Sequence, residues 1–564
     1  MARDPDDGGV FVFDLVDDET DGPEASLAPI EPGAAEEPDG DEPALRELTA
    51  PQMLSRRLRV VAPVAAVLAI VLGTGFAVDG VRDAARMERI RAVDGGVLDL
   101  SAPLEEVWEW EGRMDVDPTF GVFEVADLQG TLAFRSGDEV VGLDPASGEE
   151  AWTVPLGTDV ECGPTGGSLG WAPPQSTLVC LQGAAAEREV VVVGADGVVT
   201  GPRTLRAADT REYGTPRPGP AGTVLRAERV GPRSAVDLGE SECGPEGECS
   251  GTVDGGRDLV LRAEDAATGE ERWRVTVPFR PTGAENCASW MYGMPWDAPA
   301  GLGWPDEAPG PDESAIDPEV FGADIGAGLI DLWGCGVQSS VTPDGLVLRT
   351  GGGAPAFGGV VVLPSGGYAG QDVSSDGQGS TSTTLFGPGG DVIGSIGGYA
   401  TGPQVTDEPG AMTLLGVDGS GERLLSYAVD GTPRWNVAQG TDPSQFLAQV
   451  DGTAVAMNWM AELRGLDLAT GAERWTWQPS DDLDDWSEES GGYVAQAFTD
   501  GQFLLLQLYG GNGGAGLVSL DVASGEQAWH RTDADGASGW PGAVLVAVDG
   551  HLLEVTQTGV HGLG

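Results

Sequence analysis

Six cysteines and three histidines are the residues of this 564-residue sequence with the clearest capacity for redox or metal chemistry. None of the cysteines forms a Cys-x-x-Cys pair, and the histidines are distant from them in the sequence, so the spacing does not fit a zinc site. An even, dispersed set instead predicts three disulfides in an oxidising compartment. The sequence leaves their connectivity open, and we expect nearest neighbours to pair. The expected pairs are Cys162 with Cys180, Cys243 with Cys249, and Cys287 with Cys335; the histidines are His530, His551 and His561.

A second set of residues repeats along the chain: an Asp that ends a strand, a glycine turn, and a Trp that follows the turn. The Asp can accept hydrogen bonds from turn amides, the Gly supplies the positive φ of a hairpin, and the Trp is a large apolar anchor. A catalytic group would occur once, so a group repeated in every unit indicates packing between repeats. The copies are Asp144 with Trp152, Asp265 with Trp273, Asp430 with Trp435, Asp467 with Trp475, and Asp521 with Trp529.

The stretch 281–335 is long and irregular for a loop within a repeat. Long loops in compact folds are often functional, and exposed aromatic residues rimmed by polar ones suit recognition. Its aromatic side chains are therefore a candidate binding surface. The alternative is a disulfide-tied flap whose tryptophans cover the edge of a sheet. The aromatic residues are Trp290, Tyr292, Trp296 and Trp304.

Other catalytic and metal-binding patterns find no support in the sequence. The acidic run 481–489 lacks the Gly and the terminal Glu of an EF-hand loop, which favours a solvated loop over a calcium site. No Gly-x-Ser-x-Gly elbow, Walker motif or dinucleotide-binding motif stands in the context that its chemistry needs. The net charge of -60 repels phosphate backbones and argues against nucleic-acid binding. We predict no catalytic, cofactor or metal site.

The spacing of the repeats predicts the architecture that positions these residues. Trp435 and Trp475 are 40 residues apart, and Trp475 and Trp529 are 54 apart. This is the length of a four-stranded propeller blade with its loops. Runs such as 190–193 and 503–508 are typical of strands, whereas a helical solenoid would show a period of 3.6. We therefore predict an all-β fold, a single β-propeller.

The number of blades follows from counting turns. Weaker copies of the turn at 195–197, 363–366 and 386–390 raise the count to about eight, with seven as the alternative. We expect the last strands, from 544 onward, to be completed by the early strand 107–110. Such pairing would lock the two ends of the propeller together and remove exposed edges.

The repeated Leu-Asp-x-x-Thr-Gly-x-x-x-Trp pattern resembles the quinoprotein-like propeller repeat, named for dehydrogenases that use pyrroloquinoline quinone (PQQ). The resemblance covers about 104–564 and implies a propeller of eight or seven blades. The enzymes of that fold hold PQQ against a disulfide between adjacent cysteines and use calcium and a catalytic Asp. No two cysteines are adjacent here, so we expect a non-catalytic binding module. A divergent PQQ-dependent dehydrogenase is the alternative.

The region before the propeller has three parts. Residues 1–57 are acidic, with 16 Asp or Glu in the first 50, and are expected to be a disordered tail. An apolar island at 10–18 is either a docking motif for a cytoplasmic partner or a chance cluster. Residues 58–78 include an uncharged run of 19, long enough for a transmembrane signal anchor. Residues 79–103 are expected to form a stalk before the propeller, 104–564.

Charge alone does not orient the expected membrane helix, because arginines flank it equally. The cysteines decide the orientation, since disulfides persist outside the cytoplasm. The sequence therefore predicts a cytoplasmic N-terminus and an extracellular propeller, which meets a protein or ligand there. The overall layout resembles that of single-pass membrane proteins of high-GC Gram-positive bacteria.

Overall fold

The computed structural model describes residues 88–564 apart from internal gaps, and the described residues all belong to the compact unit Val78–Gly564. The predicted tail 1–57 and membrane span 58–78 lie outside the described residues. Within the part described, no helix is long and apolar enough to cross a bilayer. The gaps are 92, 94, 115, 118–121, 124, 166–173, 185–187, 245–248, 289–295, 297–315, 352–358, 374–379, 418–422, 439–442, 459–461, 480–492, 510–514 and 533–542.

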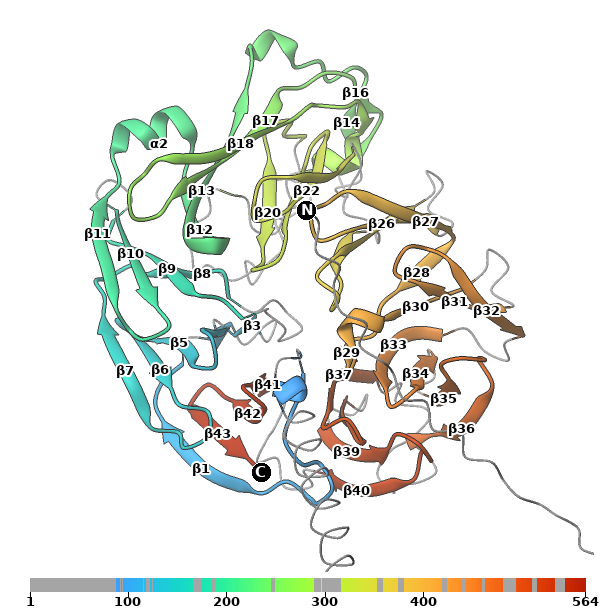
Figure 1. Cartoon of the computed structure of the whole chain (residues 1–564). Helices are drawn as coiled ribbons and strands as arrows, with labels where there is room; N and C mark the ends of the chain where they lie inside the picture. Colours follow the sequence, from blue (N-terminus) through green and yellow to red (C-terminus); the bar gives the residue numbers. More distant parts are fainter. Residues whose placement is uncertain are drawn as a thin grey trace, which may run out of the picture. The chain divides into compact units, whose positions relative to one another are not determined.

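Nine sheets of four or five strands follow one another along the described chain and form a ring of blades (Figure 1). Blade 1 contains β4 (Val125–Asp127), β5 (Leu132–Ser136), β6 (Glu139–Leu143) and β7 (Glu150–Pro155). Blade 2 contains β8 (Glu161–Gly163), β9 (Thr177–Gln182), β10 (Glu189–Gly194) and β11 (Val199–Thr204). Blade 3 contains β12 (Pro216–Gly219), β13 (Thr223–Val230), β17 (Asp258–Asp265) and β18 (Glu271–Val277).

The next three blades continue in chain order. Blade 4 contains β20 (Phe321–Ile325), β21 (Ile330–Gly334), β22 (Val337–Val341) and β23 (Val347–Gly351). Blade 5 contains β24 (Val360–Val362), β25 (Tyr368–Val373), β26 (Ser380–Phe386) and β27 (Val392–Gly397). Blade 6 contains β28 (Tyr399–Thr401), β30 (Thr413–Val417), β31 (Arg423–Ala428) and β32 (Pro433–Ala438).

The last three blades include one five-stranded sheet and the closing blade. Blade 7 contains β29 (Val405–Thr406), β33 (Pro443–Val450), β34 (Thr453–Asn458), β35 (Leu463–Asp467) and β36 (Glu473–Trp477). Blade 8 contains β37 (Tyr493–Thr499), β38 (Phe503–Tyr509), β39 (Ala515–Asp521) and β40 (Gln527–Thr532). Blade 9 contains β41 (Val544–Val548), β42 (His551–Val555), β43 (Gly559–Leu563) and β1 (Glu106–Glu111).

Inner and outer strands differ in sequence because they differ in burial. In β38 every residue after Phe503 is buried, since both faces of this strand meet neighbouring blades, and the strand reads as a continuous apolar run. The outer strand β7 is mostly exposed and carries alternating polar residues. Each of the nine seams between consecutive blades holds a cluster of buried apolar side chains. The ring is therefore closed, and the predicted all-β propeller is confirmed.

The predicted closure of the ring by its two ends is also confirmed. β1 pairs antiparallel with β43, with Trp110 opposite Val560. β1 thus becomes the outer strand of a blade whose other three strands end the chain. Trp108 and Trp110 pack against the cluster shared by blades 9 and 1.

The predicted count of eight blades is wrong, because the structure has nine in its described residues. The turns at 363–366 and 386–390 were counted as two blades, but both lie in blade 5, between β24 and β25 and between β26 and β27. Blade 4 was missed because its turn has Thr342 where the repeat has Asp, and Asp344-Gly345 where the repeat has Ser-Gly or Thr-Gly. Blade 9 has no such turn, since its third and fourth strands come from opposite ends of the propeller.

The described part of the expected stalk, from residue 88, packs against the propeller. Residues 88–91 form one helical turn, and Ile90, Val97 and Leu100 are at most 2% exposed. The amide of Val97 donates to the carbonyl of Thr499 in blade 8 (2.9 Å), and the amide of Leu98 donates to that of Gly550 in blade 9 (2.7 Å). We call residues 88–105 the lead-in segment. The lead-in segment lies in the seam between blades 8 and 9.

Candidate functional site

The repeated Trp residues each bridge two blades. Trp475 is 8% exposed, and its Nε1 donates to the carbonyl of Val522 in the next blade (2.8 Å). Its ring covers Gly525, which has a φ of +72°, and a Cβ there would come within 2.4 Å of the ring. Only glycine therefore fits beneath this Trp. The same bond runs from Trp152 to Ala195, from Trp273 to Pro343, from Trp435 to Leu468, and from Trp529 to Leu100.

The hydrogen bond from Trp529, in the seam between blades 8 and 9, ends on the lead-in segment instead of on a blade turn. Blade 9 has no turn that could offer the usual carbonyl, and Leu100 of the lead-in segment supplies it at 2.8 Å. The hydroxyl of Ser519 donates to the same carbonyl (2.9 Å). The lead-in segment therefore takes the place of a missing blade turn.

An arginine takes the place of the Trp in one seam, and sequence reasoning missed it. The Nε of Arg203 in blade 2 donates to the carbonyl of Ala266 in blade 3 (2.8 Å), and its guanidinium lies over Gly269. Its Nη2 also forms an ion pair with buried Glu264 (3.0 Å). The ladder between β10 and β11 is irregular after Val190, which moves Arg203 two positions beyond the expected Trp. Because of this shift, the spacing of the repeat does not reveal that Arg203 occupies the place of the Trp.

The repeated Asp residues hold the turns that the tryptophans cover. Oδ1 of Asp467 accepts the amides of Ala469 and Thr470, and Oδ2 accepts Nη2 of Arg474 (2.6 Å). The hydrogen bond from Arg474, followed by that from Thr470, lowers the pKa of Asp467 to about 2. Asp144, Asp265, Asp430 and Asp521 likewise accept turn amides. The Asp and Trp of the repeat are thus occupied in building the ring.

Two segments beside blades 3 and 4 form a lobe outside the ring, and they bring together the remaining residues of interest. We call the described residues within 231–257 and 278–320 the disulfide-braced lobe. Its two segments are joined by the pairing of β16 (Thr252–Val253) with β19 (Thr282–Gly283). Its other short elements are η2 (Arg233–Ala235), β14 (Glu242–Cys243), β15 (Cys249–Ser250) and η3 (Ala284–Cys287).

Two of the three disulfides brace this lobe. Cys243–Cys249 closes the hairpin of β14 and β15, and Cys287–Cys335 joins the lobe to the turn between β21 and β22 in blade 4. The third, Cys162–Cys180, links two strands of blade 2. All three join the nearest neighbours in the sequence, as predicted. Cys287, Cys335 and Val253 are fully buried and form a small core of their own, with Phe279 packed against it.

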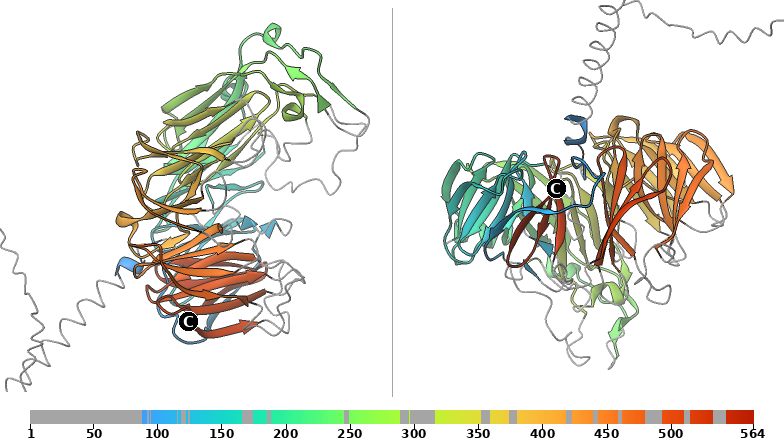
Figure 2. Two further views of the ribbon diagram at one scale, coloured as in Figure 1. Left: turned by 90° about the vertical axis from the view of Figure 1, so that its right-hand side faces the viewer. Right: turned by 90° about the horizontal axis from the view of Figure 1, so that it is seen from below.

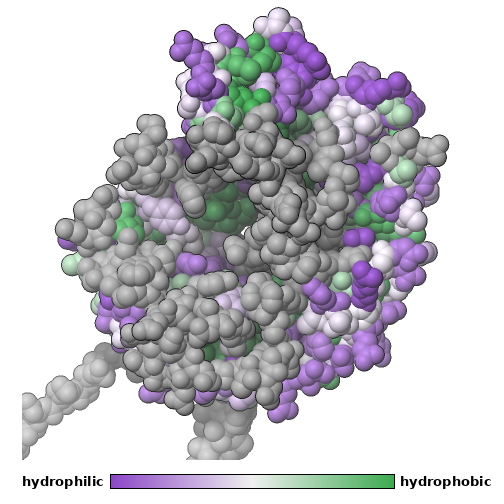
Figure 3. Space-filling view, turned by 180° about the vertical axis from the view of Figure 1, so that it is seen from behind, coloured by the Kyte–Doolittle hydropathy of each residue, from purple (hydrophilic) through white to green (hydrophobic). Residues whose placement is uncertain are grey.

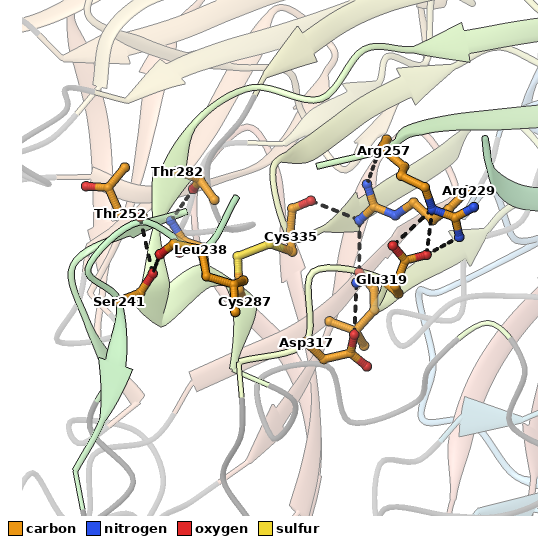
Figure 4. The surroundings of a disulfide bond; sticks show 12 residues. Arg229, Leu238, Ser241, Thr252, Arg257, Thr282, Cys287, Asp317, Glu319 and Cys335 are labelled. Carbon is orange, nitrogen blue, oxygen red and sulfur yellow. Dashed lines mark hydrogen bonds and ion pairs between the residues drawn. A yellow bond between two sulfur atoms is a disulfide. The ribbon is translucent and has the colours of Figure 1, made fainter. Parts of the chain in front are cut away.

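Arginines fix the base of the lobe to the ring (Figure 4). Arg229 of β13 is buried, and its Nη2 donates to the carbonyls of Val320 (3.1 Å) and Cys335 (2.9 Å). Arg257 forms an ion pair with Glu319, which lowers the pKa of the Glu319 carboxyl. The ion pair joins the two segments of the lobe to each other, and Nη1 of Arg229 donates to the carbonyl of Arg257 (2.9 Å), so Arg229 ties both segments to blade 3.

The predicted aromatic insertion, 281–335, is shorter than expected, and Trp296 is not part of an exposed surface. Residues 321–325 and 330–334 are strands of blade 4 rather than loop. Trp296 is 3% exposed, and its Nε1 donates to the carbonyl of Thr215 (2.9 Å). Its ring stacks on Phe321 at 6.0 Å, so it covers a blade edge, as the flap alternative expected. Trp290, Tyr292 and Trp304, like the acidic run 481–489, lie outside the described residues.

The lobe and the lead-in segment lie on opposite faces of the ring. Both side views show β14 and β16 extending from one face while residues 88–91 lie on the other (Figure 2). The face that carries the lobe is mostly hydrophilic at its described rim (Figure 3). Described side chains exposed on the lobe include Leu238, which is 39% exposed, and Asp237, Glu240, Glu242 and Asp254.

A pair of carboxyl groups in blade 4 has raised pKa values. Asp324 and Asp331 are cross-strand partners on β20 and β21. Burial raises the pKa of Asp331 to about 6, even though Ser340 donates a hydrogen bond to it. Within the part of the chain described, no group of three or more His, Cys, Asp or Glu could hold a metal ion. His530 is exposed and contacts only Gln527 in the described structure.

Comparison with known proteins reveals distant structural likeness only. No family model matches the sequence, and no curated protein matches it. Solved structures similar to this chain include BamB from Moraxella catarrhalis (12% identity, TM-score 0.34), covering 82% of this chain and 97% of that one. Saccharomyces cerevisiae Sqt1 (10%, 0.33) covers 82% and 99%, and the computationally designed Ika8 protein (8%, 0.31) covers 81% and 98%. The propeller assignment rests on the sheet order and closure described above.

Proposed function

We propose that this chain is a non-catalytic docking protein that presents the disulfide-braced lobe to a protein partner. The observation that carries the proposal is the way in which the lobe is built. It projects from the ring on its own small core, held by two disulfides and the buried Arg229. A surface fixed before binding loses less conformational entropy when a partner docks.

The three disulfides support an extracellular position for the propeller, because disulfides persist outside the cytoplasm. We propose that 58–78 anchors the chain in the cell membrane, with the N-terminus cytoplasmic and the propeller outside. The described chain enters the propeller at residues 88–91, on the face opposite the lobe. In this arrangement the lobe lies outside the cell, where a partner can reach it. Its exposed acidic residues favour a partner with a basic surface.

Site-specific photo-crosslinking in intact cells tests the proposal. A photoreactive amino acid is placed at Leu238 on the lobe or at Val107 on β1, which is 61% exposed and serves as the matched control. We expect one protein to be captured from position 238 and not from 107. The same capture should be lost in a Cys287→Ala/Cys335→Ala variant, because the lobe then loses its covalent link to blade 4 and the core around that link. Equal capture from both positions, or capture that survives loss of the disulfide, would contradict docking through the lobe.

A further inference from the structure

The seam between blades 6 and 7 contains a cavity of about 260 Å³. Its walls are apolar and include Leu424 and Val437 of blade 6 and Ala456 and Met457 of blade 7. An engineered apolar cavity of about 150 Å³ is large enough to bind benzene. The space is therefore sufficient for one substituted aromatic ring.

Arg464 lines one side of the cavity, and its guanidinium is paired with two carboxylates. Nη2 of Arg464 lies 3.0 Å from Oε1 of Glu462, and Nη1 lies 3.7 Å from Oε2 of Glu473. The other oxygen of Glu462 accepts Nδ2 of Asn458 (3.1 Å). The edge of the guanidinium is thus engaged by carboxylates, and an anionic ligand would meet two negative charges. A neutral ligand avoids that repulsion.

The same position in blade 3 shows what such a guanidinium accepts. The repeat aligns Arg464 with Arg262, Glu473 with Glu271, and Ala456 with Arg226. Arg262 is paired with Glu271 at 2.9 Å, as Arg464 is with Glu473. However, the guanidinium of Arg262 lies 4.0 Å from the ring centroid of Tyr213, at the end of α2 (Ala207–Tyr213).

The two seams differ in what fills the space over the arginine. Between blades 2 and 3, Tyr213 covers Arg262, and the fully buried side chain of Arg226 fills the space beside it. Between blades 6 and 7, alanine replaces Arg226, and Arg464 lines the cavity. The chain thus supplies its own aromatic ring in one seam, and in the other the described residues leave a cavity beside the matching arginine.

We propose that the cavity between blades 6 and 7 binds a neutral phenol-type aromatic ring that stacks on Arg464. The apolar walls contact the edges of the ring, and the guanidinium lies on its face as Arg262 lies on Tyr213. A cation over an aromatic face strengthens binding by about two- to thirtyfold. The ring belongs either to a free phenol or to a tyrosine of a partner.

Ligand-observed NMR titration of the full chain with p-cresol, the side-chain analogue of tyrosine, tests the site. Its saturated counterpart, 4-methylcyclohexanol, carries the same substituents on a ring without an aromatic face, and we expect it to bind about two- to thirtyfold more weakly. Equal binding of the two probes would overturn the stacking. N-acetyltyrosinamide separates the sources: tighter binding than p-cresol assigns the ring to a partner's tyrosine, and weaker binding assigns it to a free phenol.

Three variants locate the binding. Arg464→Lys keeps the charge but loses the planar face, and we expect p-cresol to bind about two- to tenfold more weakly. The matched Arg262→Lys, where the chain supplies its own ring, should leave p-cresol binding unchanged. Ala456→Leu fills the cavity and should abolish binding while the thermal melt stays cooperative. Unchanged binding in Ala456→Leu would overturn the site.

A further variant separates an external ring from one that the chain supplies. Trp459 follows Asn458 in the sequence and lies outside the described residues. If the ring comes from outside, Trp459→Ala should bind p-cresol as the unmodified chain does. Binding that occurs only in Trp459→Ala would show that the chain fills this cavity itself and would overturn the proposal.

Discussion

The seam between blades 7 and 8 and the seam between blades 4 and 5 hold the same ring together by different chemistry. In the first, Trp475 covers Gly525, and 18 described residues form one buried apolar cluster. In the second, Leu346 covers Gly390 and the described cluster has five members. The face of blade 4 at that seam carries Asp331, and Arg349 pairs with Asp372 of blade 5.

The comparison indicates that a seam with the repeat motif is stabilised mainly by one large side chain. Where the motif is intact, a single Trp links the two blades by its ring and its Nε1–H. Where the motif lacks its Trp, the seam depends on residues that are specific to that seam, such as Arg203 between blades 2 and 3. Substitutions should therefore have concentrated effects in the first kind of seam and dispersed effects in the second.

The largest contrast is expected between Trp475→Ala and Leu346→Ala. Trp475 is 8% exposed and leaves a large cavity when truncated, which should lower the free energy of unfolding by about 3–5 kcal/mol. Leu346 is 41% exposed, and its loss should cost less than about 1 kcal/mol. Urea unfolding of both variants measures the difference. Equal losses would mean that the two seams do not differ in the way described.

The next largest effect concerns pH and the carboxyl of Asp331. Burial raises its pKa to about 6, so in the folded chain it stays protonated after an unfolded chain, with a pKa of about 3.9, has ionised. Stability should therefore fall as the pH rises from about 4 to 6, by about 3 kcal/mol in all. Asp331→Asn, which still accepts the bond from Ser340, should remove that part of the fall. Urea unfolding at pH 4 and pH 7 tests this, with the more exposed Asp372→Asn as the control, which should keep the fall.

A smaller effect is expected from Arg203→Met in the seam between blades 2 and 3. The change removes the bond to the carbonyl of Ala266 and one partner of Glu264, which is 3% exposed. Arg226 and Arg262 still face Glu264, so the loss should be about 2 kcal/mol rather than that of a fully unpaired charge. The control is Arg274→Met, which breaks an exposed pair with Glu271 and should cost under about 1 kcal/mol. A loss from Arg203→Met no greater than that of the control would show that Arg203 does not act as a seam residue.

The smallest effect is expected in the turns. Asp467→Ala removes the acceptor for the amides of Ala469 and Thr470 and should lower the midpoint of the thermal melt slightly. Asp391→Ala lies beside the glycine-rich turn of blade 5 and serves as the matched change outside the intact motif. Its cost should be lower, and thermal melts of the two variants provide the comparison. A reversed order would indicate that the Asp of the motif does not hold its turn.

The sequence predicts those features that depend on local chemistry or on repetition. The disulfide pairs, the Asp turns, the bridging tryptophans and the closing strand β1 all follow from residues that recur or lie near their partners. The role of Arg203 was not predictable, because an irregular ladder shifts it out of the repeat. The burial of Trp296 depends on Thr215, just before β12, and on Phe321 of β20, and a single sequence does not show such contacts.

The pairing of β1 with β43 has a consequence for how the protein is made. Glu106 leaves the ribosome long before its partner Leu563, which lies near the end of the sequence. At about 5–20 residues per second, β1 waits on the order of 20 to 90 s for that partner. During this time both its edge and the growing end of the ring are open to pairing with other chains. Closure thus requires that synthesis has passed β43, and a product that ends before β43 would keep an open edge that proteases and chaperones can recognise.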